Sequence, residues 1–91
     1  MEFDWDADKA KANLRKHGID FVGIPDRFQG ETVTVFADRF DYGEQRYVTF
    51  GILEGRILAV AHTESEEKIR VISARKATRN EQESYYKTIR N

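Results

Sequence analysis

The sequence predicts one α+β domain over residues 1–91, with two N-terminal helices, a four-stranded and mainly antiparallel sheet, and a C-terminal helix. Two observations predict this fold. Apolar residues recur at helical spacing before residue 30 and after residue 78, whereas residues 32–74 show strand-like alternation and β-branched runs. The strand-like segments also follow one another through short connections, as the strands of an antiparallel meander do.

The N-terminal segment begins with Phe3 and Trp5 alternating with acidic residues, a pattern typical of a short strand or a hydrophobic arm. Asp6 is a suitable N-cap for a helix over about residues 7–17. Gly18 suits the left-handed position that ends such a helix. A first helix with defined ends is therefore expected.

This first helix is expected to have an apolar and a polar face. The spacing i, i+4, i+7 places Ala10, Leu14 and His17 toward the core. The neighbouring polar stripe of the same spacing contains Lys9, Asn13 and Lys16.

A second short helix is expected over residues 20–29, because Phe21, Ile24 and Phe28 share one helical face. Pro25 removes a backbone hydrogen bond beyond the first turn. This helix is therefore either short or begins near Ile24.

The periodicity changes from helical to alternating after residue 31. The predicted strands cover residues 32–37, 46–52, 56–63 and 69–74. Residues 38–45 form a polar loop between the first two strands. Glu54 and Gly55 are the hairpin turn between the second and the third.

The last predicted strand carries a cation inside it, Arg70, and another as it ends, Arg75. A buried cation costs several kcal/mol, on the order of 2–5, unless it is paired or faces water. An ion pair of Arg70 with Glu81 or with an N-terminal carboxylate such as Asp6 is one explanation. Regular alternation places Arg70 and Arg75 on opposite faces, so they share a site only if the strand bulges or ends near Ser73.

The C-terminal helix has a clear start. Thr78 and Glu81 have the spacing of a capping box, in which each side chain bonds the backbone N–H of the other. The helix is expected to reach about Ile89, with Tyr85 and Ile89 on its packing face.

Composition excludes several classes of function. The absence of cysteine rules out thiol catalysis and disulfides and suits a cytoplasmic protein. No apolar run approaches the roughly 20 residues of a membrane span, and the acidic N-terminus is unlike a signal peptide, so no membrane contact is expected. No metal-ligand motif and no glycine-rich phosphate loop occur, so neither a metal nor another cofactor is expected.

Charge is distributed unevenly along the chain. Residues 1–45 hold six Lys/Arg against ten Asp/Glu, and residues 46–91 hold nine against six, which gives −4 and +3 and the total of −1. The basic second half is a weak sign of a nucleic-acid partner. A solvated surface of mixed charge explains it equally well.

The remaining polar residues suit the cleavage of RNA. RNA supplies its own nucleophile, the 2′-hydroxyl, so a protein need only place proton carriers and cations around the phosphate. The predicted catalytic residues are His17, Arg70, Arg75 and Tyr86. The predicted RNA-binding residues, which contact phosphates or stack on a base, are Lys9, Lys16, Arg46, Lys76 and Tyr85.

Structural explanations compete with these assignments. His17 lies in the last helical turn, where a histidine can simply cap the helix end. Arg75 and Lys76 can form a solvated approach to the last helix. The whole chain can also be a non-catalytic module whose basic face binds an acidic segment of a protein partner.

Motifs along nearly the whole chain resemble the BrnT toxin family. In the N-terminal half these are Phe3-x-Trp5-Asp6, Lys9, Asn13 and Lys16-His17-Gly18-Ile19-x-Phe21. In the C-terminal half they are Glu44-x-Arg46, Gly51, Arg70-Val-Ile-Ser73-Ala74-Arg75-x-Ala77, Glu81 and Tyr85–Tyr86. The Lys-His-Gly and Ile-Ser-Ala-Arg pieces are specific in combination.

The resemblance implies a RelE-like fold and a ribonuclease toxin of a type II toxin–antitoxin system, which cleaves RNA and blocks translation. It also implies a BrnA-type ribbon-helix-helix antitoxin, and contact with operator DNA only through that antitoxin. The chain departs from the family pattern at Pro25, where a helix usually continues, and at Gln82, where arginine is common.

Overall fold

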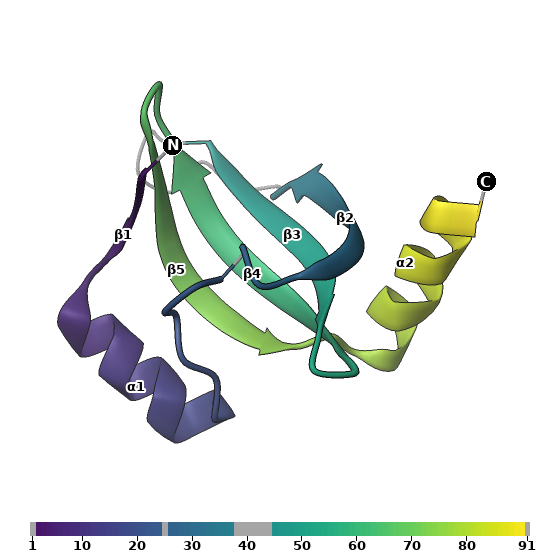
Figure 1. Cartoon of the computed structure of the whole chain (residues 1–91), viewed down its shortest axis with the longest axis horizontal. Coiled ribbons are helices and arrows are strands. Elements are labelled where there is room, and N and C mark those ends of the chain that lie inside the picture. The colour runs from purple at the N-terminus through teal and green to yellow at the C-terminus, as the bar shows by residue number, and fades with distance from the viewer. Residues whose placement is uncertain (1, 25, 38–44, 91) are drawn as a thin grey trace.

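The computed structural model describes residues 2–24, 26–37 and 45–90. These residues form a single mixed sheet with helices near two of its sides (Figure 1). In chain order the elements are β1 (Glu2–Trp5), α1 (Ala7–His17), β2 (Gln29–Phe36), β3 (Arg46–Leu53), β4 (Arg56–Glu64), β5 (Lys68–Lys76) and α2 (Arg79–Arg90).

The sheet has five strands in the order β1-β5-β4-β3-β2. Strand β1 pairs parallel with β5, and the other neighbours pair antiparallel. The predicted α+β class and the antiparallel meander are confirmed. The predicted strand number is wrong by one, because the N-terminal alternation around Phe3 forms a true edge strand.

The predicted strands lie within β2 to β5, apart from Ala37, which follows the end of β2. The hairpin turn is confirmed, because Glu54 and Gly55 have φ of 53° and 78°, the left-handed pair of a type I′ turn. Of the predicted loop over residues 38–45, all but Gln45 lies outside the described residues.

The predicted helix over residues 20–29 is not found in the described part of that segment, which forms turns before β2 begins. Asp20 Oδ1 accepts a hydrogen bond from the Val22 N–H at 3.0 Å, and Gly23 has a φ of 81°. Both features replace helical hydrogen bonding by a turn. The apolar spacing in this segment nevertheless identifies core residues, because Phe21 and Ile24 are buried.

The ends of α1 match the prediction. Asp6 accepts from the N–H groups of Asp8 and Lys9 at 2.9 and 3.1 Å. Gly18, with a φ of 70°, donates its N–H to Leu14 O at 2.8 Å. The predicted core-facing stripe is wrong at Leu14, whose side chain is 48% exposed.

Asn13 is the buried residue of α1, although its type placed it on the polar stripe. Its Nδ2 donates to Ile19 O at 3.0 Å and to Ala74 O at 2.9 Å, and its Oδ1 accepts from the Ala74 N–H at 3.1 Å. The pairing of β1 with β5 ends at Val71. Beyond that point, the Asn13 amide bonds the backbone of β5 as a neighbouring strand does.

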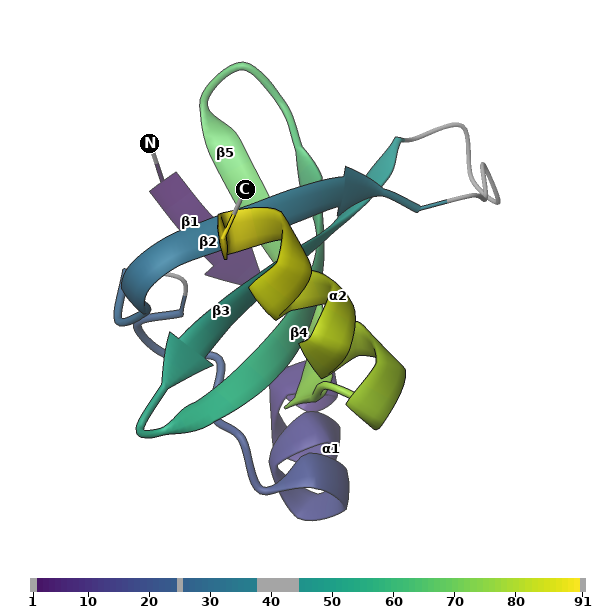
Figure 2. The ribbon, with the colours of Figure 1, turned by 90° about the vertical axis from the view of Figure 1, so that its right-hand side faces the viewer.

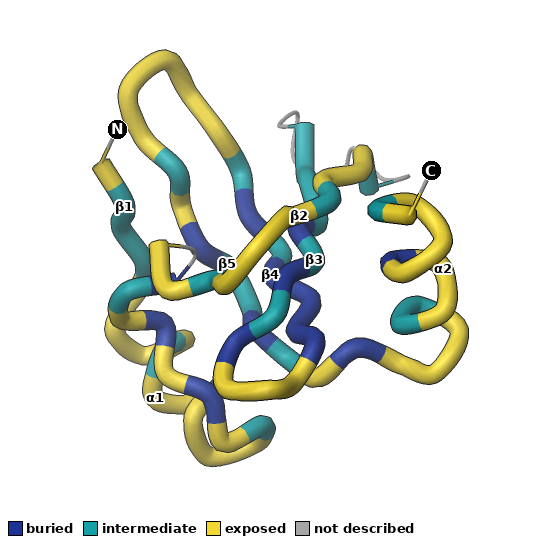
Figure 3. The backbone as a smooth tube through the Cα atoms, turned by 45° about the vertical axis from the view of Figure 1, so that its right-hand side comes forward, coloured by how far each residue is buried: buried dark blue, intermediate teal, exposed yellow. Residues whose placement is uncertain are grey.

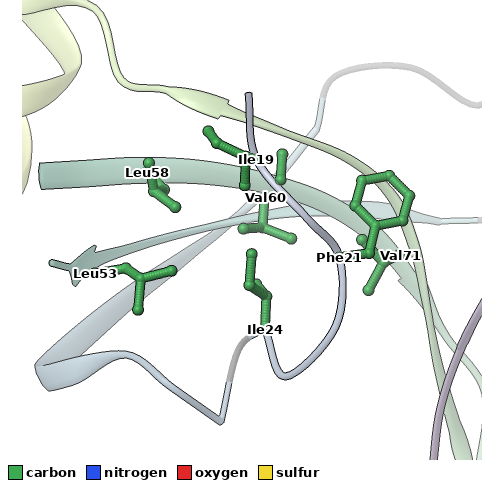
Figure 4. Packing of buried hydrophobic residues seen from close by; sticks show 8 residues of the cluster. Ile19, Phe21, Ile24, Leu53, Leu58, Val60 and Val71 are labelled. Atoms are coloured by element: carbon green, nitrogen blue, oxygen red, sulfur yellow. The ribbon is translucent and has the colours of Figure 1, made fainter. Parts of the chain in front are cut away.

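Two apolar clusters cover the sheet. The cluster against α1 centres on Phe21, Leu58, Val60 and Val71 (Figure 4). The smaller cluster packs the predicted face of α2 on the sheet and contains Ile57, Ala77, Tyr85 and, partly buried, Val33, Phe50, Ile52 and Ile89. Strand β4 is largely buried between them, whereas the turn from β4 to β5 is exposed (Figure 3).

Candidate functional site

A β-bulge interrupts the pairing of β4 with β5. Ser73 lies opposite Ala61, and Val71 lies opposite His62, although Ala61 and His62 are consecutive. Ile72 is therefore the extra residue of β5. Such a residue shifts the alternation of the strand that contains it.

The bulge places the two arginines of β5 on the same face of the sheet. Arg70 lies opposite Thr63, and Arg75 lies opposite Ala59. Thr63 and Ala59 are four residues apart on β4, so they and their partners share a face. This is the face that α2 covers in part (Figure 2), and the two arginine backbones lie roughly 13 Å apart along the strand.

Arg75 is held by Glu81. Its Nη1 and Nη2 donate to Glu81 Oε1 and Oε2 at 2.7 and 3.0 Å, and Nη1 also donates to Lys76 O at 3.2 Å. Glu81 closes the predicted capping box, because its Oε1 accepts from the Thr78 N–H at 2.8 Å while its own N–H donates to Thr78 Oγ1 at 3.2 Å. One carboxylate thus fixes both the start of α2 and the orientation of Arg75.

The hydrogen bonds from Arg75 hold the pKa of Glu81 at about 2, well below its usual 4.5. Because the folded pKa is depressed, the stabilisation is complete above the unfolded pKa and is lost as pH falls from about 4.5 through about 2. We expect the free energy of unfolding from urea titrations to fall by about 1 kcal/mol more in the wild type than in Glu81→Gln between about pH 6 and pH 3, because solvent partly screens this half-exposed ion pair. Equal acid sensitivity of the two proteins would show that Glu81 is not the group responsible.

Arg70 has a weaker partner than Arg75. Its Nη1 donates to Asp4 Oδ1 at 3.1 Å, and its side chain is 52% exposed. Asp4 also lies 3.8 Å from Lys68 Nζ. The expected partnership with an N-terminal carboxylate is therefore present, but with Asp4 and not with Asp6 or Glu81.

Arg46 belongs to the same cross-strand row as Arg70. Arg46 on β3 lies opposite Thr63 on β4, which lies opposite Arg70 on β5. Directly opposed residues share a face, so the two arginines flank Thr63 on the α2 side. Lys76 lies opposite the buried Leu58, so alternation places its exposed side chain on the other face.

The predicted residues of α1 gather beside the bulge. Lys9, Lys16 and His17 line a shallow depression together with Ile72 and Ser73 of β5. Ser73 lies between Arg70 and Arg75 on β5, and strand alternation places its side chain on the same face of the sheet as theirs, which α2 covers in part. The bulge at Ile72 is therefore next to both the arginines of β5 and the candidate residues of α1.

The two tyrosines of α2 have different environments. Tyr85 is buried, donates its hydroxyl to Glu31 O and lines a cavity between α2 and the face of β2 and β3, and its RNA-binding role stays a prediction. Tyr86 is 40% exposed, with the Arg90 guanidinium 5.7 Å from its ring centroid. It lines a depression with Glu83, Lys87 and Arg90, separate from the residues of the bulge.

Sequence reasoning missed three parts of this arrangement. It did not identify Asp4 as the partner of Arg70, Glu81 as the partner of Arg75, or Asn13 as the residue that joins α1 to β5. The capping-box spacing of Thr78 and Glu81 indicated that Glu81 has a structural role. No sequence pattern indicates that a single asparagine will be buried, because asparagine is usually exposed.

Within residues 2–24, 26–37 and 45–90, no helix is long and apolar enough to cross a membrane. No group of three or more His, Asp and Glu side chains that could hold a metal ion occurs in the same residues.

Comparison with known proteins agrees with this picture. The model of a protein family described as "Ribonuclease toxin, BrnT, of type II toxin-antitoxin system" matches residues 5–81. The matched segment contains every candidate residue except Tyr85 and Tyr86. No curated protein matched the sequence. Because the family match covers most of the 91 residues, the chain belongs to the BrnT family of ribonuclease toxins of type II toxin–antitoxin systems.

Proposed function

We propose that this chain is a RelE-like, metal-independent endoribonuclease that cleaves RNA by means of its 2′-hydroxyl and thereby inhibits translation. The bulge at Ile72 is the observation that carries the proposal. It places Arg70 and Arg75 on one face and brings Ser73 next to Lys16 and His17. An RNA strand crossing β5 at this point meets cations from both sides.

Arg75 is the transition-state cation of the proposed reaction. Its hydrogen bonds to described residues use three of its five N–H donors, which leaves the Nε–H and one Nη2–H. These two donors lie on one edge of the guanidinium and match two oxygens of a phosphate. The side chain is 39% exposed, which supports access of a phosphate to the guanidinium.

Arg70 and Arg46 position the RNA in this proposal. The single hydrogen bond between Arg70 and Asp4 is exposed, and a pair of this kind contributes little stability. A phosphate can therefore replace the Asp4 carboxylate on Arg70. Lys9 and Lys16 contact the backbone beyond the bulge, and Lys76 contributes positive charge from the opposite face.

His17 is the proton carrier. It accepts the proton of the 2′-hydroxyl, whose oxygen attacks phosphorus while the bond from phosphorus to the 5′-oxygen breaks. The products are a 2′,3′-cyclic phosphate and a 5′-hydroxyl end once the leaving oxygen has taken a proton. Tyr86 lies outside this arrangement, and its catalytic role stays a prediction.

The proposed partner is a BrnA-type ribbon-helix-helix antitoxin. Carboxylates of the chain itself already bind Arg70 and Arg75, which supports the binding of acidic groups at this face. An acidic segment of the antitoxin would bind the same face and exclude RNA. The complex would contact operator DNA through the antitoxin alone.

The test uses the purified toxin and a structured RNA with EDTA present. We expect cleavage to continue in EDTA, to stop when a 2′-deoxynucleotide stands at the cleaved position, and to fall at least tenfold in His17→Ala. Lys11→Ala, an exposed change on the same helix, is the matched control. Loss of cleavage in EDTA, or cutting at the 2′-deoxy position, would contradict the mechanism.

A non-catalytic module that binds an acidic protein segment is the second candidate. The observation in its favour is that Arg70 and Arg75 each have a carboxylate partner, as in a structural ion-pair network. Expression in a bacterial host distinguishes the two. Growth arrest that a neighbouring gene product relieves supports the nuclease, whereas harmless expression with tight partner binding supports the module.

A further inference from the structure

A cavity of about 280 Å³ lies between α2 and the face of β2 and β3. Its floor is apolar and consists of Val33, Val35 and Phe50. Its helical wall carries the polar side chains of Asn80, Ser84 and Thr88. The volume is at the lower end of small-molecule sites, roughly 300 Å³, and suits a planar group larger than a water molecule but smaller than a nucleotide.

The lining of this cavity suits an aromatic heterocycle. An apolar floor accepts the flat face of a base, and the polar wall can bond its edge. The Asn80 side chain offers both donors and an acceptor, and none of them is used by the residues that the structure describes. The Thr88 hydroxyl donates to Ser84 O and keeps its acceptor positions.

The position of the cavity relates it to Arg75. Phe50 of the floor lies opposite Ala59, which lies opposite Arg75, so the three share one row across the sheet. Two strand spacings separate the Phe50 and Arg75 backbones, about 10 Å. Glu81 joins the two places directly, because it lines the cavity and holds the Arg75 guanidinium. A phosphate on Arg75 therefore leaves an adjoining base within reach of the cavity.

We propose that this cavity is a base pocket, which binds one unstacked RNA base next to the cleaved phosphate and so sets the sequence preference of cleavage. The proposal rests on the ribonuclease function proposed above. It assigns to Val33, Val35 and Phe50 the stacking surface and to Asn80 the reading of the base edge. Ser84 lines the cavity, so a large side chain at this position would occupy its space.

The first experiment measures base binding without any cleavage. The methyl NMR signals of Val33 and Val35 are followed while each of the four 3′-nucleoside monophosphates is added to the intact protein. We expect at least one nucleotide to shift both signals, with Ser84→Trp weakening that binding at least tenfold. Lys87→Trp places the same ring on α2 outside the cavity lining and is expected to leave the binding unchanged.

The second experiment measures sequence preference on an RNA pool randomised around one cleavage position. Wild type is expected to favour one base there at least fivefold, and Asn80→Ala to lose most of that preference, whereas Lys87→Trp, the matched control outside the cavity lining, is expected to keep it. No methyl shift with any nucleotide, or an unchanged preference in Asn80→Ala, would overturn the base pocket. Methyl shifts without RNA cleavage would support the pocket and overturn the ribonuclease mechanism.

Discussion

Replacement of Arg75 by glutamine is expected to lower the rate of RNA cleavage by a factor of about 10² to 10³, the usual effect of removing one donor to a developing oxyanion. Glutamine keeps one hydrogen-bond donor for Glu81 but removes the positive charge and the paired Nε–H and Nη2–H. Those two donors are the part of Arg75 that Glu81 and Lys76 leave available. The rate is measured on a fixed RNA at saturating concentration, so that weaker binding does not mimic slower chemistry.

Two further variants separate charge from structure. Arg75→Lys retains the charge without the planar pair of donors, and we expect it to recover less than a tenth of the lost rate. Arg56→Gln removes an exposed arginine from the start of β4 and is the matched control, with an expected rate within twofold of wild type. A normal rate in Arg75→Gln would remove Arg75 from the chemistry and leave it as the partner of Glu81.

The helices and strands of this fold could be predicted where the residues that determine them lie close together in the sequence. The N-cap at Asp6, the glycine at the end of α1, the Glu54–Gly55 turn and the Thr78–Glu81 capping box each depend on residues a few positions apart. The periodicity that placed β3 and β4 is local as well. The prediction of a second helix over residues 20–29 was wrong. Phe21 and Ile24 have helical spacing in the sequence, but they reach the core from a segment that forms turns.

The residues of the candidate site could be proposed from the sequence, and their roles stay predictions, but the geometry that relates them could not be predicted. The two arginines of β5 were identifiable as cations that need a partner, and regular alternation gave them opposite faces. The bulge residue Ile72 shifts the alternation, so both arginines lie on the same face of the sheet. A bulge depends on how β4 pairs with β5, and the run Arg70-Val-Ile-Ser73 reads as an ordinary strand without its neighbour.

The attachment of α1 to the site depends on long-range contacts that no spacing reveals. Asn13 and Ala74 are 61 positions apart in the chain. Helical periodicity favours Leu14 for the core, since it is the larger apolar residue. The structure buries Asn13 instead, because the backbone of β5 needs hydrogen-bond partners beyond the end of β1.

Replacement of Asn13 by alanine is accordingly expected to cause the largest loss of stability among single changes on α1. The variant leaves three backbone groups without their partner, the Ala74 N–H, Ala74 O and Ile19 O. Each buried group that loses its bond costs about 1–3 kcal/mol, and we expect a total of at least about 3 kcal/mol. Urea unfolding measures this loss, and Lys11→Ala, an exposed change on the same helix, is expected to remain within about 0.5 kcal/mol of wild type.

The same change is expected to affect the reaction more than a remote change of equal stability cost. Asn13 holds α1 against β5, and α1 carries Lys16 and His17 to the bulge. Ile57→Ala provides the comparison, because it removes a buried side chain from the cluster against α2 and costs about 2–5 kcal/mol without touching that attachment. At a temperature where both variants are folded, Asn13→Ala should cleave RNA at least tenfold more slowly than Ile57→Ala. Equal rates would show that the position of α1 does not depend on Asn13, since the helix would then hold His17 in place by its apolar contacts alone.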